Sequence, residues 1–227
     1  MTDAGALYRL LAWLSPGYPV GAYTYSHGLE QAIEAGYIDD AVSVREWIGD
    51  IVTFGGGFSD TVFLAEAYRA TTRRDKLRLK EVAEVASVFV ASKELALETR
   101  AQGAAFLEIT ERAWKTPEFD LLRSVWSGAV VYPVAVGCAA AGHGIALVDV
   151  AHGYQHAFAA NLVSAAVRLV PLGQTDGQRT LAALEKDVEE SVKRAMATDI
   201  ENVSSAALMV DICSMKHETQ HTRLFRS

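Results

Sequence analysis

Apolar residues recur along most of the chain at the three- and four-residue spacing of an α-helix. The first stripe contains Leu7, Leu10, Leu11 and Leu14 and ends at the Pro-Gly pair of positions 16 and 17. No stretch shows the sustained alternation of apolar and polar residues that marks a β-strand. The pattern therefore predicts an all-α fold, with residues 1–227 forming a single domain built as a bundle of about ten helices.

Several helix ends also follow from the pattern. Ser43 and Glu46 form a capping-box sequence at the start of a helix that the three glycines at 55–57 end. Charged residues with helical spacing predict one helix from about 178 to 197 and another from about 199 to 215.

The segment between positions 124 and 175 is almost uncharged, since Asp149 and Arg168 are its only charged side chains. Two successive helices, at about 131–147 and 150–169, are therefore apolar on nearly all sides. Such helices are typical of the centre of a bundle. We expect these two helices to lie at the centre of the fold.

Composition limits the kinds of partner. The chain has 227 residues, half of them hydrophobic, and a formal net charge of -7, which argues against a nucleic-acid surface.

Residues 129–148 are long enough to span a bilayer, but they are rich in Ala and Gly and lack flanking basic residues, so a buried helix is favoured over membrane contact. Cys138 and Cys213 lie in apolar runs, and the N-terminus shows no leader pattern, so we expect a cytoplasmic protein with reduced thiols.

The loop at 169–179 separates two helical patterns. Pro171 ends the first pattern, two glycines allow unusual backbone angles, and Asp176 is placed to cap the helix that follows. On physical grounds alone an ordinary helix-to-helix turn is the preferred interpretation.

Three segments of the chain resemble parts of one known family. They are the loop at 169–179, the segment Ser15 to Glu30 (SPGYPVGAYTYSHGLE), called here the N-terminal signature, and the segment His217 to Ser227 (HETQHTRLFRS), called the C-terminal tail. Together they resemble the urease accessory protein F (UreF) family of helical proteins. The resemblance covers essentially the whole chain, although Ala22 and Tyr23 stand where many members have Gly and Phe, and His27 where many have Gln.

The resemblance implies a non-enzymatic scaffold without a cofactor of its own. Such a scaffold pairs with the accessory protein called D or H in different organisms, forms a homodimer within that complex, and recruits the nickel-carrying GTPase accessory protein G. The assembly then meets apo-urease, so that nickel is inserted under control of GTP hydrolysis. Regulation of the GTPase by this chain is a further expectation.

The candidate partner-binding residues come from the three matched segments. In the signature, Tyr23 and Tyr25 add aromatic area that suits either an interface or the plugged end of a bundle. Glu30 is a candidate for a basic partner group, although a solvated carboxylate in the first turn of a helix is the simpler interpretation. The remaining candidates are polar or apolar residues of the loop and the tail: Gln174, Asp176, Arg179, Arg223, Leu224 and Phe225.

Polar residues dominate the C-terminal tail and leave it little apolar surface with which to fold alone. Leu224 and Phe225 lie between Arg223 and Arg226, an arrangement that suits a pocket with an acidic rim. We therefore expect the tail to be mobile in the free protein and ordered against the D/H-type partner. The alternative is a tail packed back on its own helices.

Two histidine pairs have the four-residue spacing with which a helix presents two ligands to a transition metal. His152 and His156 lack a local carboxylate, so a structural role in the core or an interface is preferred. His217 and His221 lie beside Glu218 and are a minor candidate for transient nickel binding. We predict no stable metal site.

The sequence contains no Gly-Lys dipeptide and hence no phosphate-binding P-loop, so we expect no GTP hydrolysis by this chain alone. Two other classes of function stay open. One is an all-α enzyme or small-ligand binder with a pocket near His143, His152 and His156, and the other is a nickel storage protein.

Overall fold

The computed structural model describes residues 3–227 of the chain. Within these residues it contains α-helices and two short 3₁₀-helices but no strand, which confirms the all-α prediction. The α-helices are α1 (Ala4–Trp13), α2 (Leu29–Glu34), α3 (Ala41–Phe54), α4 (Gly56–Arg73), α5 (Lys76–Val88), α6 (Lys93–Ala113), α7 (Glu118–Val125), α8 (Tyr132–Gly142), α9 (Leu147–Leu169), α10 (Gln174–Ala183), α11 (Glu185–Met196) and α12 (Leu208–His217). The 3₁₀-helices are η1 (Ala22–Thr24) and η2 (Ile200–Asn202).

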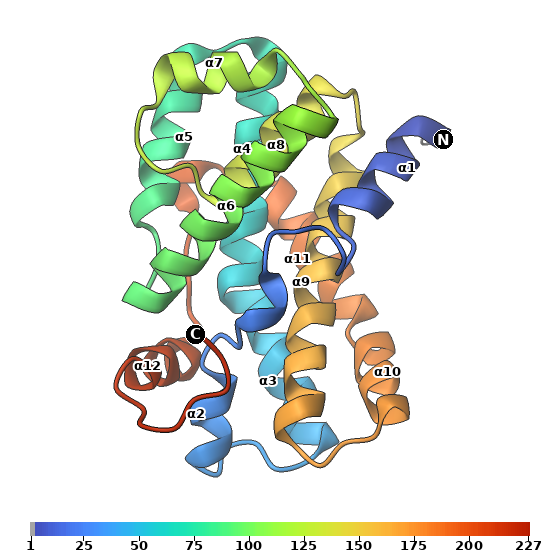
Figure 1. Cartoon of the computed structure of the whole chain (residues 1–227), viewed down its shortest axis with the longest axis vertical. Coiled ribbons are helices and arrows are strands. Elements are labelled where there is room, and N and C mark those ends of the chain that lie inside the picture. The colour runs from blue at the N-terminus through green and yellow to red at the C-terminus, as the bar shows by residue number, and fades with distance from the viewer. Residues whose placement is uncertain (1–2) are drawn as a thin grey trace.

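The helices enclose two large hydrophobic clusters that follow one another along the long axis of the molecule (Figure 1). The upper cluster is built mainly by α4 to α8, and Phe63 and Phe106 are among its members. The lower cluster is built by α2, α3, α12 and the second half of α9, and it contains Ile48 and Leu162. Because α9 also contributes Tyr154 to the upper cluster, this helix connects the two.

The centre of the bundle is formed by α4, α8 and α9. All residues of α8 from Pro133 to Ala140 are buried, as the uncharged sequence predicts. Gly137 lets α8 approach α4 closely, because an added Cβ would lie 2.5 Å from the carbonyl oxygen of Leu64. The sequence pattern did not predict the central position of α4, because this helix contains many polar residues. Several of them are nevertheless buried. One is Thr61, whose hydroxyl donates a hydrogen bond to the Gly57 carbonyl at 2.7 Å.

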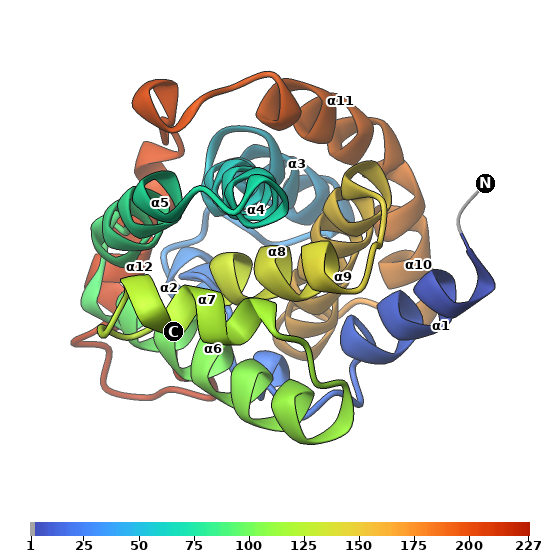
Figure 2. The same cartoon turned by 90° about the horizontal axis from the view of Figure 1, so that it is seen from above.

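Helix α1 packs by a different face from the one that its leucines predicted. Leu7 and Leu11 are 50% and 65% exposed, whereas Trp13 is fully buried. The indole of Trp13 meets Phe106 at a ring-centroid distance of 5.8 Å and His143 at 5.3 Å. The large aromatic side chain therefore sets the rotation of the helix, which extends along one side of the body in Figures 1 and 2.

Some predicted helix starts are wrong by a few residues. The α3 helix begins three residues earlier than Ser43 implied, because Asp40 is the N-cap and Ser43 supplies the reciprocal hydrogen bond of the capping box. The charged region predicted as one helix at about 178–197 is divided into α10 and α11 at Leu184, a fully buried residue of the lower cluster.

Within residues 3–227, none of the helices combines the length and the apolar character needed to cross a membrane. The uncharged stretch at 129–148 is interrupted between α8 and α9, where Gly144 takes a left-handed backbone conformation with φ of 64°.

Candidate partner-binding site

The fold brings the N-terminal signature and the C-terminal tail together, although they lie at opposite ends of the sequence. Figure 1 shows the tail running beside α2 and the segment that precedes it. At Gly28 an added Cβ would lie 2.7 Å from the backbone nitrogen of Ser214, so only glycine lets α12 pack this closely on the signature. The φ of 76° at Gly28 adds a second reason for glycine at this position.

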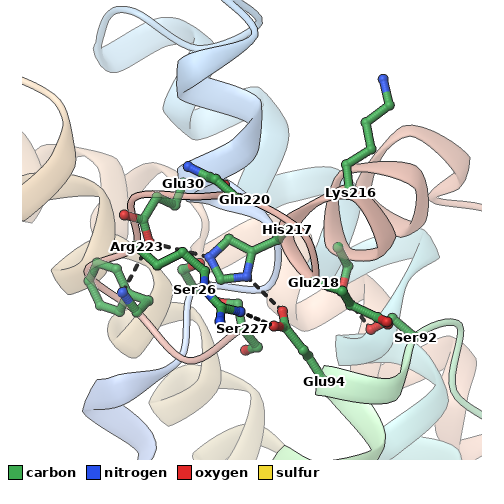
Figure 3. Close-up of polar contacts among 12 residues, drawn as sticks. Ser26, Glu30, Ser92, Glu94, Lys216, His217, Glu218, Gln220, Arg223 and Ser227 are labelled. Carbon is green, nitrogen blue, oxygen red and sulfur yellow. Dashed lines mark hydrogen bonds and ion pairs between the residues drawn. The ribbon is translucent and has the colours of Figure 1, made fainter.

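Glu30 holds the backbone of the tail. Its carboxylate accepts hydrogen bonds from the backbone N–H groups of Leu224 at 2.6 Å and Phe225 at 3.0 Å. The Nε2 atom of His217 lies 3.3 Å from the same carboxylate (Figure 3). Glu30 is therefore neither solvated nor free for a basic partner group in this conformation, and its role is to organise the tail.

His217 lies buried between two carboxylates. Its Nδ1 atom is 2.6 Å from Glu94, on the side of the ring opposite Glu30. Glu94 also accepts a hydrogen bond from the guanidinium of Arg223 at 2.6 Å (Figure 3). Each ring nitrogen of His217 thus faces a carboxylate oxygen, and Arg223 places a positive charge beside Glu94. Buried charges are tolerated in proteins when they are paired and hydrogen-bonded in this way.

The last residues of the tail are anchored on the signature and on α9. The Phe225 ring is buried, with the Arg168 guanidinium 4.5 Å from its centroid. Arg168 also donates to the Tyr23 carbonyl at 2.9 Å, and the backbone N–H of Arg226 donates to the Thr24 carbonyl at 2.8 Å.

The structure therefore shows the alternative that we considered for the tail, since it is packed back on its own helices. At its end, the Ser227 carbonyl accepts the backbone N–H of Ser26 at 2.6 Å, and the Ser227 hydroxyl donates to Glu98 at 2.8 Å. The expectation of a tail that is mobile in the free protein considered only apolar surface, and this mobility stays a prediction. Charge-assisted hydrogen bonds hold this segment instead.

Part of the joined signature and tail stays on the surface. Tyr23 and Leu224 are 61% and 65% exposed, and the side chain of Arg223 is partly exposed. Tyr25 in contrast is buried, and this burial raises the pKa of its phenol above the ordinary value. Of the two tyrosines, Tyr23 is thus accessible to a partner, whereas Tyr25 is enclosed by the chain itself. We call the exposed side chains of Tyr23, Arg223 and Leu224 the terminal surface.

The loop at 169–179 forms a second, separate candidate surface. It lies at the start of α10, on the side of α3 and α9 opposite to α12, in both views (Figures 1 and 2). Asp176 does not cap the helix, because α10 already begins at Gln174 and Gly173 occupies the N-cap position. Asp176 instead pairs with Arg179 one turn later at 3.2 Å, and the Arg179 side chain is largely exposed whereas that of Asp176 is partly buried.

Neither histidine pair is arranged as a set of metal ligands in the structure. The α12 helix ends at His217, so the exposed His221 does not share a helix face with it. Residues 217–221 also read His-Glu-Thr-Gln-His, which is the sequence pattern of a zinc-protease helix. Here, however, Glu218 accepts a hydrogen bond from the backbone N–H of Lys93 at 2.8 Å, and His217 is enclosed by carboxylates. On α9, His156 is exposed, so the core role considered for it is wrong.

Three functional side chains of this site were not found from the sequence. Glu94 and Glu98 occupy the first two turns of α6, and Arg168 the last turn of α9. Glu94 follows the N-cap residue Ser92, which explains its position as an acidic residue near a helix N-terminus. Nothing in the local pattern indicates that these residues contact a segment more than fifty positions away.

Comparisons with known proteins agree over nearly the whole chain. A family model described as UreF matches residues 38–185. The protein named urease accessory protein UreF from Bradyrhizobium sp. strain BTAi1 is 52% identical over 225 residues, which is 99% of this chain and 93% of the relative. The protein of the same name from Rhodopseudomonas palustris strain BisA53 is 49% identical over 224 residues, which is 99% of this chain and 94% of that relative.

Proposed function

The chain belongs to the UreF family of urease accessory proteins, and from that membership we propose that it acts as a non-catalytic scaffold in urease maturation. In this proposal it joins the D/H-type accessory protein and the nickel-carrying GTPase G to apo-urease in the cytoplasm, as a homodimer within the complex. The chain itself carries no cofactor, and its contacts regulate when the GTPase acts.

The terminal surface is the observation that carries this proposal. Tyr23 and Leu224 expose apolar area, the Arg223 side chain is partly exposed, and aromatic residues and arginine are enriched at protein interfaces. The carboxylates beneath this surface are occupied by donors of the chain itself, as described for Glu30 and Glu94. These carboxylates are therefore suited to fixing the conformation of the terminal surface rather than to catalysis.

A scaffold that joins two partners needs two surfaces that do not overlap. The terminal surface and the loop at 169–179, with its candidates Gln174, Asp176 and Arg179, meet this requirement, because the tail runs beside α2 and α12 whereas the loop leads into α10, on the other side of α3 and α9 (Figure 1). We assign the terminal surface to the D/H-type partner and the loop to a second component of the assembly.

The test is co-purification with the D/H-type partner, combined with urease activation. Leu224→Asp places a charge on the terminal surface and is expected to weaken the complex at least tenfold and to lower urease activation. The melting temperature should change little, because exposed positions normally alter stability by less than about 0.5 kcal/mol. Tyr23→Ala is expected to act in the same direction.

Leu77→Asp is the matched control, because Leu77 is 84% exposed on α5 and lies outside both candidate surfaces. This variant should bind the partner and activate urease as the unmodified chain does. Equal binding by Leu224→Asp and Leu77→Asp would remove the terminal surface from the interface.

A further inference from the structure

A cavity of about 570 Å³ lies between the upper and lower hydrophobic clusters. Its walls come from the N-terminal segment, the connection between α5 and α6, and helices α3, α4, α6, α8, α9 and α12, and they are largely apolar. Aromatic rings that line it include Tyr132, Tyr154 and Phe158. Its volume falls within the range of about 300–1,000 Å³ that is usual for small-molecule sites.

Asp60 and Glu98 are two carboxylates that line this cavity deep inside the bundle, and Asp211 of α12 lines it as well. Asp60 of α4 accepts a hydrogen bond from the Tyr154 hydroxyl at 2.8 Å. Glu98 of α6 lies 2.9 Å from the Nε2 atom of His27, whose ring packs edge-on against Phe158 at 4.9 Å. These groups meet where the two apolar clusters leave space between them.

The hydrogen-bonding capacity of the two carboxylates is used unequally. Both oxygens of Glu98 are engaged, one by His27 and by the Gln102 amide at 2.9 Å, and the other by the Ser227 hydroxyl. Asp60 has one oxygen engaged by Tyr154, and its second oxygen makes no hydrogen bond within residues 3–227. Of these two carboxylates, Asp60 is therefore the one that offers a free acceptor to the cavity.

Tyr132 offers a second free polar group. Its ring lines the cavity 5.4 Å from the Tyr154 ring, and burial raises its pKa, so the phenol stays neutral. Its hydroxyl has no hydrogen-bond partner in the described part of the chain. Tyr132 and Asp60 both keep some accessible surface, and since both line the cavity, that surface faces the open space.

The charges in the cavity favour a cationic occupant. With His27 protonated and both carboxyls ionised, Asp60, Glu98 and His27 together carry one net negative charge, and the carboxyl of Asp211 lines the same cavity. Aromatic faces such as those of Tyr132, Tyr154 and Phe158 add attraction for a cation with an organic body. A bare metal ion is a poorer match, since the described residues contain no group of three or more His, Cys, Asp or Glu side chains that could hold one.

We propose that the cavity binds a small alkylammonium ion, whose head group donates to Asp60 and Tyr132 and whose alkyl chain lies among the aromatic rings. This site adjoins the terminal surface, since Tyr23 is among its lining residues, and it includes no residue of the loop at 169–179. A scaffold that binds its protein partners would therefore carry a small-molecule site inside the bundle.

Titration calorimetry and thermal shift on the full chain test this site with n-butylammonium, n-hexylammonium, n-butanol and ammonium chloride. The two alkylammonium ions are expected to bind and to raise the melting temperature. Affinity should increase up to about fourfold per added methylene, since each one buries further apolar area. Butanol lacks the positive charge and ammonium lacks the alkyl chain, so each should bind at least tenfold more weakly than butylammonium.

Asp60→Asn keeps the shape of the side chain and an acceptor for the Tyr154 hydroxyl but removes the charge, and it should lower the affinity for butylammonium at least tenfold. Asp39→Asn, on the exposed segment before α3, is the matched control and should bind normally. Ala157→Leu, one turn after Tyr154 on the face of α9 that lines the cavity, fills the space and should abolish binding even if Asp60→Asn does not fold.

Partner co-purification is read separately in each variant, so failure of this site and failure of the scaffold proposal are distinguishable. Equal affinity for butanol and butylammonium, or unchanged binding by Ala157→Leu, would overturn the proposal. Nickel chloride that competes with butylammonium and loses its own binding in Asp60→Asn would also overturn it, in favour of a metal site.

Discussion

The contact of α4 with α8 and the contact of the tail with the signature hold the molecule by different means. The first consists of small and apolar side chains such as Gly137 and Ala140, which let two helix backbones approach closely. The second consists of carboxylates that accept hydrogen bonds from an imidazole, a guanidinium and backbone N–H groups. The first depends on shape, and the second on charge and hydrogen bonding.

The two regions should differ in how they unfold. Separating the closely packed helices of the core costs free energy, because it exposes apolar area to water. The groups of the tail are polar, and water can replace their partners once the tail has left. The core is therefore expected to fail together with the whole fold, whereas the tail can detach locally.

The largest effect is expected from Gly137→Val. The added Cβ would lie 2.5 Å from the Leu64 carbonyl oxygen and 3.2 Å from the Ala67 Cβ, so α4 and α8 would have to separate. Overpacking against a backbone atom should cost roughly 3 kcal/mol or more and abolish the cooperative thermal transition. Ala141→Val, at a half-buried position of the same helix, is the control and should keep a cooperative transition close to that of the unmodified chain.

The second prediction concerns Asp60, a carboxyl placed between the two hydrophobic clusters. Burial raises its pKa from an ordinary 3.8 to about 6, although the Tyr154 hydrogen bond and His27 oppose this. A carboxyl with a raised pKa contributes stability that is fully present below pH 3.8 and is lost as the pH rises through about 6. The protein should lose roughly 3 kcal/mol of unfolding free energy over that interval through this group.

Denaturant unfolding of the unmodified chain and of Asp60→Asn between about pH 4 and pH 8 measures this contribution. The difference between the two proteins should favour the variant progressively as the pH rises. The pKa of His27 is lowered by burial but raised in total by Glu98 and Asp60, so the variant also removes the part of the His27 contribution that comes from Asp60, and that part has the same pH direction. A stability difference that is independent of pH would show that Asp60 titrates normally.

A smaller effect is expected from Glu30→Gln, which tests the tail. The change removes the charge that receives His217 and the backbone N–H groups of Leu224 and Phe225. It should cost about 1–2 kcal/mol, because hydrogen bonds to charged groups are stronger than neutral ones. Amide hydrogen exchange should become fast at 224 and 225 while the amides of α8 stay protected.

Glu34→Gln is the control for this change, since Glu34 accepts only the exposed Gln220 amide among the described contacts. Exchange at 224 and 225 should be the same in this variant as in the unmodified chain. If Glu30→Gln slowed exchange in the tail or left it unchanged, the carboxylate would not be what holds the segment.

The fold was more predictable from the sequence than the site. The uncharged run that becomes α8 is a local signal, because a helix without charges on any side has few positions to occupy other than the centre of a bundle. The face of α1 was less predictable, since one buried Trp13 outweighs the leucines Leu7 and Leu11 in setting the rotation. Helix content can thus be found locally, but orientation depends on which large side chain finds a pocket.

The candidate site depends on contacts that no local pattern contains. Glu30 and Glu94 contact His217 across 187 and 123 positions of sequence, respectively. The polar composition of the tail is compatible with a mobile segment and with one that is hydrogen-bonded throughout. The deciding information is the position of acceptors on α2 and α6, which only the folded chain shows.

The smallest effect on stability is expected from Asp176→Ala in the loop at 169–179. Asp176 is not the N-cap of α10, and its ion pair with Arg179 is exposed, so the change should cost no more than a few tenths of a kcal/mol. If the loop is a partner surface, urease activation should nevertheless fall severalfold, and the loss should be repeated in Arg179→Ala. Lys186→Ala, at an exposed position on the neighbouring helix α11, controls for a general loss of surface charge. Activation that is unchanged in both loop variants would leave this segment as a helix-to-helix turn, which is the interpretation that its Pro and Gly residues support without any partner.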